Sequence, residues 1–468
     1  MFGLRISISV FRGSGGELHS APSHACRRLK GMAATIARIA SRVRRPSRLG
    51  ALPVAALAAL SFAVQAAQTT YAPRIEQRFM VNDNRILVPD PEETVVGAAT
   101  DLRLVIESEG ENWRARARPR IRVTQYTGDQ DFDTDQYYLF ASVERDFERG
   151  QFTQELDVSR TSTLTSELID IGRNVIDRNR DAVSLTSSYT HYLNPRNSIT
   201  GTFLFNNVVF QDVEQTNFSD YRYYSGSATY SYSFSPTTQW FASASYARFR
   251  SITNPSISKN VTYYAGISNQ FDETLTASLS LGQVFGTVEF EDFLRFRDII
   301  PGLPFPLSEQ AFPDENGQLQ PITRQTDGAG VFLNFSFEKT WDRATFSGSL
   351  VRQVQPSSLG AQRTSTIGEG QLIYRFSQQL RSILRVERNQ AESESDDPTL
   401  GNVGLLNRDF LGIDFRTIFR INDEWQVIGQ YFHRRQDREV LGIKAQGNLI
   451  GLALVFGSAP VTGQNLWY

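Results

Sequence analysis

The sequence predicts an all-β protein, a transmembrane antiparallel β-barrel of about eighteen strands, on three observations. Apolar and polar residues alternate with a period of two along most of the chain. Short connections and long connections alternate between these segments along the chain. No stretch after residue 66 reaches the run of about eighteen apolar residues that a membrane helix needs. These features are typical of strands that cross a membrane as a closed barrel, and we expect 16–20 of them.

The composition supports a β-rich, folded protein. The 468 residues include 32 Phe, 17 Tyr and 5 Trp but only 3 Met. Such aromatic content supplies enough apolar surface to exclude a disordered chain. The mean hydropathy of −0.32 excludes a bundle of membrane helices.

Residues 1–66 are expected to form a leader that contains a signal peptide. The apolar run 49–66 follows several arginines and ends in small residues, Val64 to Ala66, at the spacing that signal peptidase recognises. Met32 is a candidate for the true start. A single membrane anchor is the competing interpretation, which Pro53 and the shortness of the run disfavour. We therefore expect export with cleavage after Ala66 and a mature chain of residues 67–468.

Removal of the leader changes the charge and the cysteine count. It takes away ten of the 48 Lys/Arg and one of the 50 Asp/Glu, which leaves 38 basic and 49 acidic residues and a net charge of about −11. Cys26, the only cysteine, also leaves, so the mature chain has no disulfide or thiolate metal site. An acidic mature chain argues against nucleic acid as a partner.

Eighteen strands follow from the alternation. In 224–234 every odd-numbered residue is Ser or Thr, and in 275–282 Leu or Ala alternates with Thr, Ser or Gly. The predicted strands are centred near residues 79, 101, 120, 141, 157, 187, 205, 228, 245, 265, 281, 332, 349, 369, 386, 414, 431 and 451.

Eight short connections join these strands in pairs and are rich in Asn, Asp, Gly, Pro and Ser, which form tight turns at little cost. They are 109–112, 148–150, 194–197, 235–238, 272–274, 340–343, 377–379 and 422–424. Longer connections lie between them, the longest being 289–325. This places both ends of the mature chain on the short-turn side, as in outer-membrane barrels. A secreted array of β-sandwiches or a solenoid is the competing interpretation.

The last strand carries a second indication of a barrel. Ile450, Leu452, Leu454 and Phe456 share one face, with Gly451 among them. This segment resembles the terminal strand that the barrel assembly machinery of the outer membrane recognises, so we expect that machinery as a partner. A tail, 457–468, follows it.

Arginine is concentrated on one face of the third strand. Five arginines alternate there with mostly apolar residues: Arg114, Arg116, Arg118, Arg120 and Arg122. Facing lipid would cost roughly 2–4 kcal/mol for each, so we expect the row to line the lumen. It either favours anions in a pore or is neutralised by carboxylates such as Asp101, Glu107 and Glu144.

A smaller inward set has candidate partners of its own, Glu387 and Asp414. Its members are Arg381, Arg385, Arg416 and Arg420.

The connection 289–325 is long and apolar for a loop, which is typical of functional loops. We expect it to insert partly into the lumen as a constriction, with Phe293, Phe296 and Phe305 as candidate constriction residues. An external loop packed on its neighbours is the alternative.

The sequence gives little support for a catalytic function. The mature chain has two histidines, His191 and His433, both on the predicted lipid-facing side of their strands. A Ser–His–carboxylate site needs its members within hydrogen-bond reach, and nothing pairs either histidine with a chosen serine. We find no phosphate loop, metal-binding histidine pair or calcium loop, so we expect no enzyme, no metal and no cofactor.

The start of the predicted barrel resembles a known family. Pro73 opens an amphipathic strand that ends before Asp83 and Asn84. This pattern is similar to the first strand of the β-barrel porin family associated with exopolysaccharide and exosortase systems. The resemblance implies an outer-membrane barrel of a Gram-negative bacterium that serves polysaccharide export or anchoring, and it supplies no catalytic residues.

The sequence therefore predicts a porin-like outer-membrane channel for small anionic solutes, or a pore associated with saccharide export. A non-conducting structural or assembly barrel is the alternative, and a barrel hydrolase is a third class. Expected partners are outer-membrane lipid and lipopolysaccharide, the barrel assembly machinery, and an anionic solute or polysaccharide with its export components.

Overall fold

The structure is a computed structural model of the chain. It describes residues 68–457 except 92, 128–131, 164–177, 212–217, 253–255, 294–320, 357–361, 394–406 and 439–441. These residues belong to one compact unit, 63–468. Among them, no helix is long and apolar enough to cross a membrane.

Eighteen strands make up the described part of the chain, and each contains one of the predicted strand centres. They are β1 (Gln68–Asn82), β2 (Val95–Glu109), β3 (Trp113–Tyr126), β4 (Thr134–Phe147), β5 (Gly150–Ser162), β6 (Asn179–Asn194), β7 (Asn197–Phe210), β8 (Tyr221–Ser233), β9 (Thr238–Ser251), β10 (Ser256–Gln270), β11 (Leu275–Phe293), β12 (Pro321–Thr340), β13 (Ala344–Pro356), β14 (Gln362–Arg375), β15 (Leu380–Ser393), β16 (Arg408–Arg420), β17 (Trp425–Arg438) and β18 (Ile443–Gly457).

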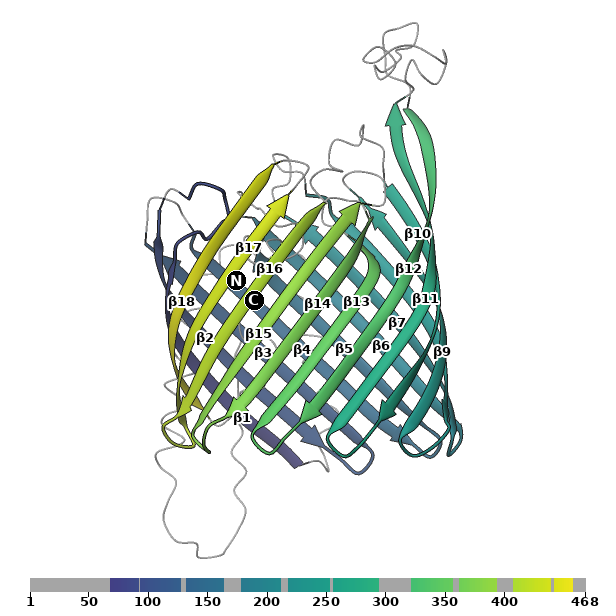
Figure 1. Ribbon diagram of the computed structural model, residues 1–468, viewed down its shortest axis with the longest axis horizontal. Helices are drawn as coiled ribbons and strands as arrows, with labels where there is room; N and C mark the ends of the chain where they lie inside the picture. Colours follow the sequence, from purple (N-terminus) through teal and green to yellow (C-terminus); the bar gives the residue numbers. More distant parts are fainter. Residues whose placement is uncertain are drawn as a thin grey trace, which may run out of the picture. The chain divides into compact units, whose positions relative to one another are not determined.

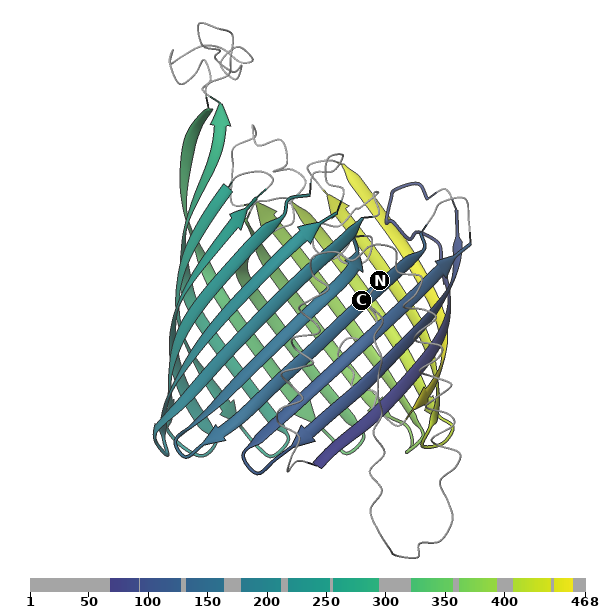
Figure 2. The same cartoon turned by 180° about the vertical axis from the view of Figure 1, so that it is seen from behind.

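All eighteen strands belong to one closed antiparallel sheet in which each strand pairs with its sequence neighbours. β1 closes the barrel on β18, from Arg74 opposite Gly457 to Asn82 opposite Leu449. The tilted strands form a cylinder in both views (Figures 1 and 2). Closure leaves no strand without a neighbour on either side, which is how a sheet satisfies its backbone hydrogen bonds in a membrane. The predicted fold class is confirmed.

The short turns gather at one end of the barrel and the longer connections at the other, as the sequence predicted. Several short turns are built by one polar side chain at their start. Asn194 Oδ1 accepts hydrogen bonds from the backbone N–H of Arg196 at 2.9 Å and of Asn197 at 3.0 Å. Asn422 and Asp272 accept from the residues two and three positions later in the same way. These local bonds explain why Asn, Asp and Ser mark the turns.

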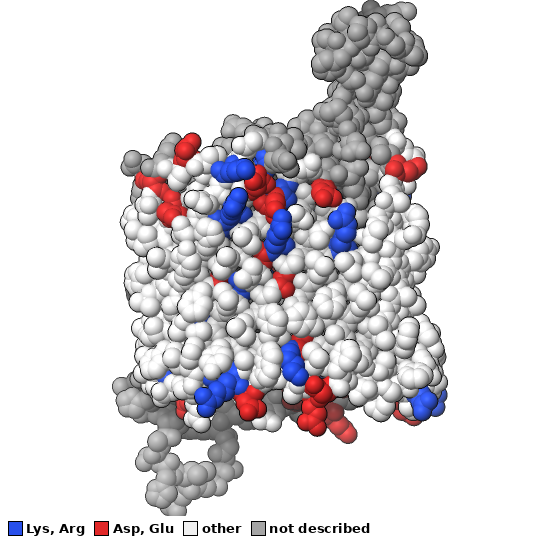
Figure 3. All heavy atoms as spheres, in the orientation of Figure 1, with Lys and Arg blue, Asp and Glu red and all other residues white. Residues whose placement is uncertain are grey.

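The outer surface is an apolar belt. Large apolar side chains are exposed on every second residue; Phe79, Leu281 and Ile450, for example, are 54–61% exposed. In one view the charged side chains gather toward the two ends and leave the middle mostly uncharged (Figure 3). At the short-turn end, exposed aromatic residues stand beside successive turns, as in the interfacial girdles of membrane barrels. They include Phe147, Phe234, Phe271, Trp341 and Phe376.

The first long connection is fastened to the last strand, β18. Asn84, which is 2% exposed, donates from Nδ2 to the carbonyl oxygens of Val88 at 2.6 Å and of Gln446 at 2.8 Å. Asp83 accepts from Asn448 through both backbone N–H (2.6 Å) and side chain (2.7 Å). The Asp83-Asn84 pair therefore holds the first loop against β18, at the seam where β1 and β18 close the barrel.

One pair of strands extends beyond the others. β11 and β12 pair as far as Phe293 opposite Pro321, whereas β12 pairs with β13 only from Leu333 onward. The resulting hairpin rises past the ends of the neighbouring strands (Figures 1 and 2).

The expected loop 289–325 is therefore corrected at both ends, because 289–293 and 321–325 are paired strand and do not insert into the lumen. The alternation of apolar and acidic residues in Val288-Glu289-Phe290-Glu291 already indicated a strand at this position. Phe293 is the last residue of β11. Phe296 and Phe305 lie outside the described residues.

Candidate functional site: the wall of the lumen

The pairing register separates the lumen-facing residues from the outward-facing ones. Asp101 on β2 lies opposite Glu76 on β1 and Arg122 on β3, and all three are at most 6% exposed. The alternate residues on these strands include Phe79 and Val96, which are 59% and 47% exposed on the outer belt. Following this parity around the sheet assigns each strand residue to the lumen or to the outside.

The arginine row, Arg114 to Arg122 on even positions of β3, lies on the lumen face and is largely ion-paired. Arg116 contacts Glu107 at 2.6 Å, and Arg114 contacts Glu109 at 2.8 Å and Glu144 at 3.9 Å.

The two deeper members of the row share one carboxylate. Asp101 accepts from Arg120 at 2.5 Å and from Arg122 at 3.1 Å. This triad is 5–10% exposed, whereas the Arg114 and Glu109 side chains are more than half exposed. The row thus changes from a solvated to a buried ion-pair network along one strand.

Arg118 differs from the other members of the row. Within the described part of the chain it forms no ion pair, and its Nε has no hydrogen-bond partner. Its guanidinium lies 4.1 Å from the ring centroid of Phe140, a cation–π distance. Arg103 lies directly across from Arg120 on the lumen face and likewise forms no ion pair among the described residues, although Asp101 and Glu76 attract it at longer range. The wall therefore carries two arginines without a contacting carboxylate beside its ion pairs, although Glu155 and Asp157 attract Arg118 at longer range.

The second predicted set, Arg381, Arg385, Arg416 and Arg420, also lies on the lumen parity of β15 and β16. Arg385 contacts Glu369 at 2.9 Å and Glu387 at 3.1 Å. Arg416 pairs with Asp414, which also accepts from Gln430 Nε2 at 2.9 Å.

Sequence reasoning missed a charged group at the seam. Arg74 contacts Glu76 at 3.0 Å, Arg78 pairs with the same carboxylate, and all three are at most 5% exposed. Buried Arg434 and Arg438 on β17 extend this group on the other side of β18. The i, i+2 spacing of charges in Arg74-Ile-Glu76-Gln-Arg78 was the available signal. We call the lumen face of β14–β18 and β1–β6 the arginine wall.

The lumen face of β7–β13, here called the hydroxyl wall, has the opposite character. Across these seven strands its residues are mostly Ser, Thr and Asn, and Glu338 is the one charged side chain among those described. Hydroxyl groups bond across strands: Ser278 to Ser336 at 2.8 Å and Thr229 to Ser243 at 2.9 Å.

A small aromatic group interrupts the hydroxyls. Tyr264 stacks on Phe332 with ring centroids 4.6 Å apart, and Phe241 meets Tyr264 edge-on at 6.4 Å. Gly282 lies between Tyr264 and Phe332 in the register. A Cβ on Gly282 would come within 2.5 Å of Tyr264 Cβ. The absence of a side chain at Gly282 therefore allows the two rings to meet.

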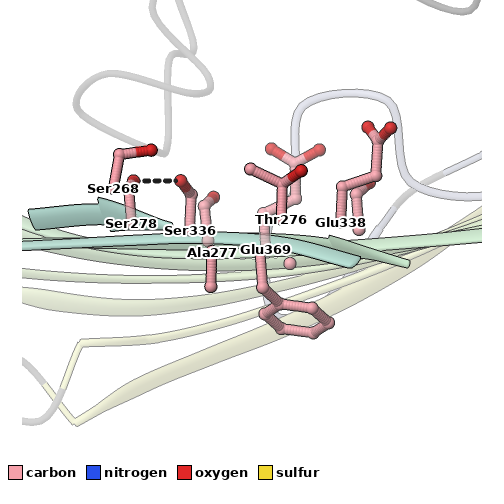
Figure 4. A pocket seen from close by; sticks show the side chains of 11 residues that line it. Ser268, Thr276, Ala277, Ser278, Ser336, Glu338 and Glu369 are labelled. Carbon is pink, nitrogen blue, oxygen red and sulfur yellow. Dashed lines mark hydrogen bonds between the residues drawn. The ribbon is translucent and has the colours of Figure 1, made fainter. Parts of the chain in front are cut away.

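A pocket marks the junction of the two walls near the short-turn end. Ser268, Ser278, Ser336 and Glu338 line it from the hydroxyl wall, and Glu369 lines it from β14 (Figure 4). Because Glu369 also pairs with Arg385, this junction combines hydroxyls, carboxylates and a guanidinium.

Both histidines of the described residues lie on the outer face. His191 stacks on Tyr189 at 6.4 Å, and His433 Nδ1 lies 3.0 Å from Asn448 Oδ1. No group of three or more His, Cys, Asp or Glu that could hold a metal ion occurs among the described residues.

A closed barrel with a charged and hydroxylated interior, an apolar outer belt and an aromatic girdle is a transmembrane β-barrel of the outer-membrane type. No protein-family model matches the chain, and no curated protein matches it.

The solved structures to which the chain is similar include three that are each 10% identical to it. For OpdL of Pseudomonas aeruginosa the TM-score is 0.39, covering 83% of this chain and 99% of that one. For a BenF-like porin of Pseudomonas fluorescens Pf-5 it is 0.42, covering 83% and 98%. For the ferric-catecholate import receptor Fiu of E. coli K12 it is 0.40, covering 82% and 81%. Likeness at this level assigns no family.

Proposed function

We propose that this protein is a porin-like channel of a bacterial outer membrane whose lumen favours small anionic solutes. The observation that carries the proposal is that two lumen-facing arginines, Arg103 and Arg118, form no ion pair within the described residues. A guanidinium stays charged at any physiological pH, and cationic side chains along a pore attract anions. The ion pairs around these two residues hold the wall in place, so the extra charge is presented from a rigid surface.

Conductance in planar bilayers under a KCl gradient tests the proposal. The wild-type protein is expected to give discrete steps and a reversal potential on the anion side. Arg118→Gln and Arg103→Gln each shift that potential toward zero, and the double variant shifts it further. Arg388→Gln removes the same charge from the outer face and is expected to leave the reversal potential unchanged. An equal shift in this control, or none in the lumen variants, would refute the selectivity.

The ion pairs of the arginine wall favour a second candidate, a non-conducting structural or assembly barrel. Arg116, Arg120, Arg385 and Arg416 all have carboxylate partners, so much of the wall cross-links itself. A folded barrel that migrates anomalously on unheated gels but gives no conductance would favour this second candidate.

Delivery and pathway are further parts of the proposal. Gln68 begins β1 two residues after the proposed cleavage at Ala66, which supports export through a cleaved signal peptide. Amino-terminal sequencing of the outer-membrane form should read from Ala67, and retention of the leader would contradict this.

The resemblance around Pro73, Asp83 and Asn84 suggests that the protein serves an exopolysaccharide system. Unchanged polysaccharide secretion after deletion of the gene would remove that link.

A further inference from the structure

Four cations gather on the outer face of the barrel near the loop end of β8–β10. We call Arg222, Arg248, Arg250 and Lys259 the outer cationic patch. Their outward parity follows from the buried residues with which they alternate, such as Tyr221, Phe249 and Ser258, which are 1–6% exposed. The three arginines are exposed, and the Lys259 side chain is 41% exposed.

The pairing register places these cations in directly opposed positions on neighbouring strands. Arg222 lies directly opposite Arg250, and Arg248 lies directly opposite Lys259. Like charges in directly opposed positions destabilise a sheet. The close approach of four cations is therefore a cost to the fold unless an anion sits among them.

Nearby carboxylates neutralise little of the positive charge of the outer cationic patch. Lys259 contacts Glu289 at 2.7 Å, and Arg222 donates from Nε to Asn207 Oδ1 at 3.2 Å. Within the described residues, neither Arg248 nor Arg250 forms an ion pair.

Strands β13–β18, further around the barrel, show the contrast. At the loop end of β13–β18, outward Arg388 pairs with Asp409 at 2.7 Å and Lys444 pairs with Asp437 at 3.3 Å. Arg352 pairs with Glu392 at 3.5 Å. Positive and negative side chains lie side by side there (Figure 3). Near the loop end, the outward charges of β13–β18 are thus neutralised by ion pairs, whereas those of β8–β10 remain mostly positive.

The position of the patch indicates what the anion is. Tyr224, Tyr246 and Tyr263, which are 40–55% exposed, lie beside the patch or toward the middle of the apolar belt. The patch therefore borders the lipid-facing surface at the end where the long connections emerge, which in outer-membrane barrels is the external side. An anion held here stands at the level of the outer-leaflet headgroups.

We propose that the outer cationic patch binds the phosphate groups of a phosphorylated lipid headgroup in the outer leaflet. The arginine forks match phosphate oxygens, and the tyrosines below contact the acyl chains. The proposal rests on the outer-membrane orientation but not on conduction. It makes the lipid a bound partner of one side of the barrel, with β13–β18 as the weaker side.

Native mass spectrometry of the protein from phosphatidylcholine nanodiscs doped with bisphosphorylated lipid A tests this proposal. Arg248→Gln/Arg250→Gln is expected to weaken lipid A retention about tenfold or more, since each cation near a membrane surface contributes about 1 kcal/mol. Arg248→Lys/Arg250→Lys should retain most of the binding. The matched control, Arg352→Gln/Arg388→Gln, removes two charges from the neutralised side and should change retention less than about twofold.

Three outcomes would overturn the proposal. They are equal retention by the patch variant and the wild type, equal retention of dephosphorylated lipid A, and complete displacement of the lipid by inorganic phosphate, which would indicate a simple anion site. The patch variant should conduct like the wild type because its substitutions lie outside the lumen. Loss of lipid retention and loss of conductance can thus be told apart.

Discussion

The arginine wall and the hydroxyl wall enclose one lumen but are stabilised by different chemistry. On the arginine wall, Asp101 holds two guanidinium groups while 4% exposed, so its charges depend on one another. On the hydroxyl wall, bonds such as Ser278–Ser336 join neutral groups, each replaceable with small loss. Two sides of one closed antiparallel sheet can therefore differ greatly in their tolerance of substitution.

The largest expected effect is on the arginine wall. Asp101→Ala leaves Arg120 and Arg122 without their shared carboxylate at side-chain exposures of 10% and 7%. Breaking a buried ion pair from one side costs about 3–5 kcal/mol. Urea unfolding in lipid vesicles should show a loss of this size. The matched change on the hydroxyl wall, Ser278→Ala, should cost about 1 kcal/mol. Equal losses from the two variants would show that the two walls tolerate substitution equally.

The hydroxyl wall has its own sensitive point at Gly282. A Cβ there would overlap the carbonyl oxygen of Tyr263 and approach Tyr264 Cα to 2.7 Å, so the backbone must shift. Gly282→Ala should therefore lower the free energy of unfolding by about 1–3 kcal/mol and disturb the stacking of Tyr264 on Phe332. Gly226→Ala, where a Cβ would meet nothing within 4 Å, is the control. Similar stabilities for both variants would show that the tight packing at Gly282 has no energetic weight.

The smallest effect concerns a carboxylate at the short-turn end of the hydroxyl wall. Hydrogen bonds from Thr274, together with Lys339 Nζ at 3.1 Å, lower the pKa of Asp272. A lowered folded-state pKa gives stability that is present above the unfolded-state pKa and is lost as pH falls through the folded-state value. Asp272→Asn should flatten the acid limb of the stability profile slightly. The effect is small because the turn is exposed. An unchanged acid limb would contradict the assignment.

The fold could be predicted almost completely from the sequence. Period-two alternation and turn residues such as Asn194 and Asn422 are local signals, and a strand spanning lipid must close into a barrel whatever its neighbours are. The lumen parity of the arginine row followed in the same way, because arginine on the lipid face is costly. The extension of β11 to Phe293 was missed because the apolar content of 289–325 outweighed its weak alternation.

What the sequence could not determine is which charges meet. Arg118 and Arg120 are two residues apart and look equivalent, yet Arg120 contacts Asp101 and Arg118 lies on the ring of Phe140. Likewise Arg248 and Arg388 are both outward arginines near the loop end, but of these two only Arg388 forms an ion pair within the described residues, with Asp409. Alternation assigns a residue to a face, because side-chain direction is local. Partners depend on register between strands far apart in sequence, and only the closed sheet sets that register.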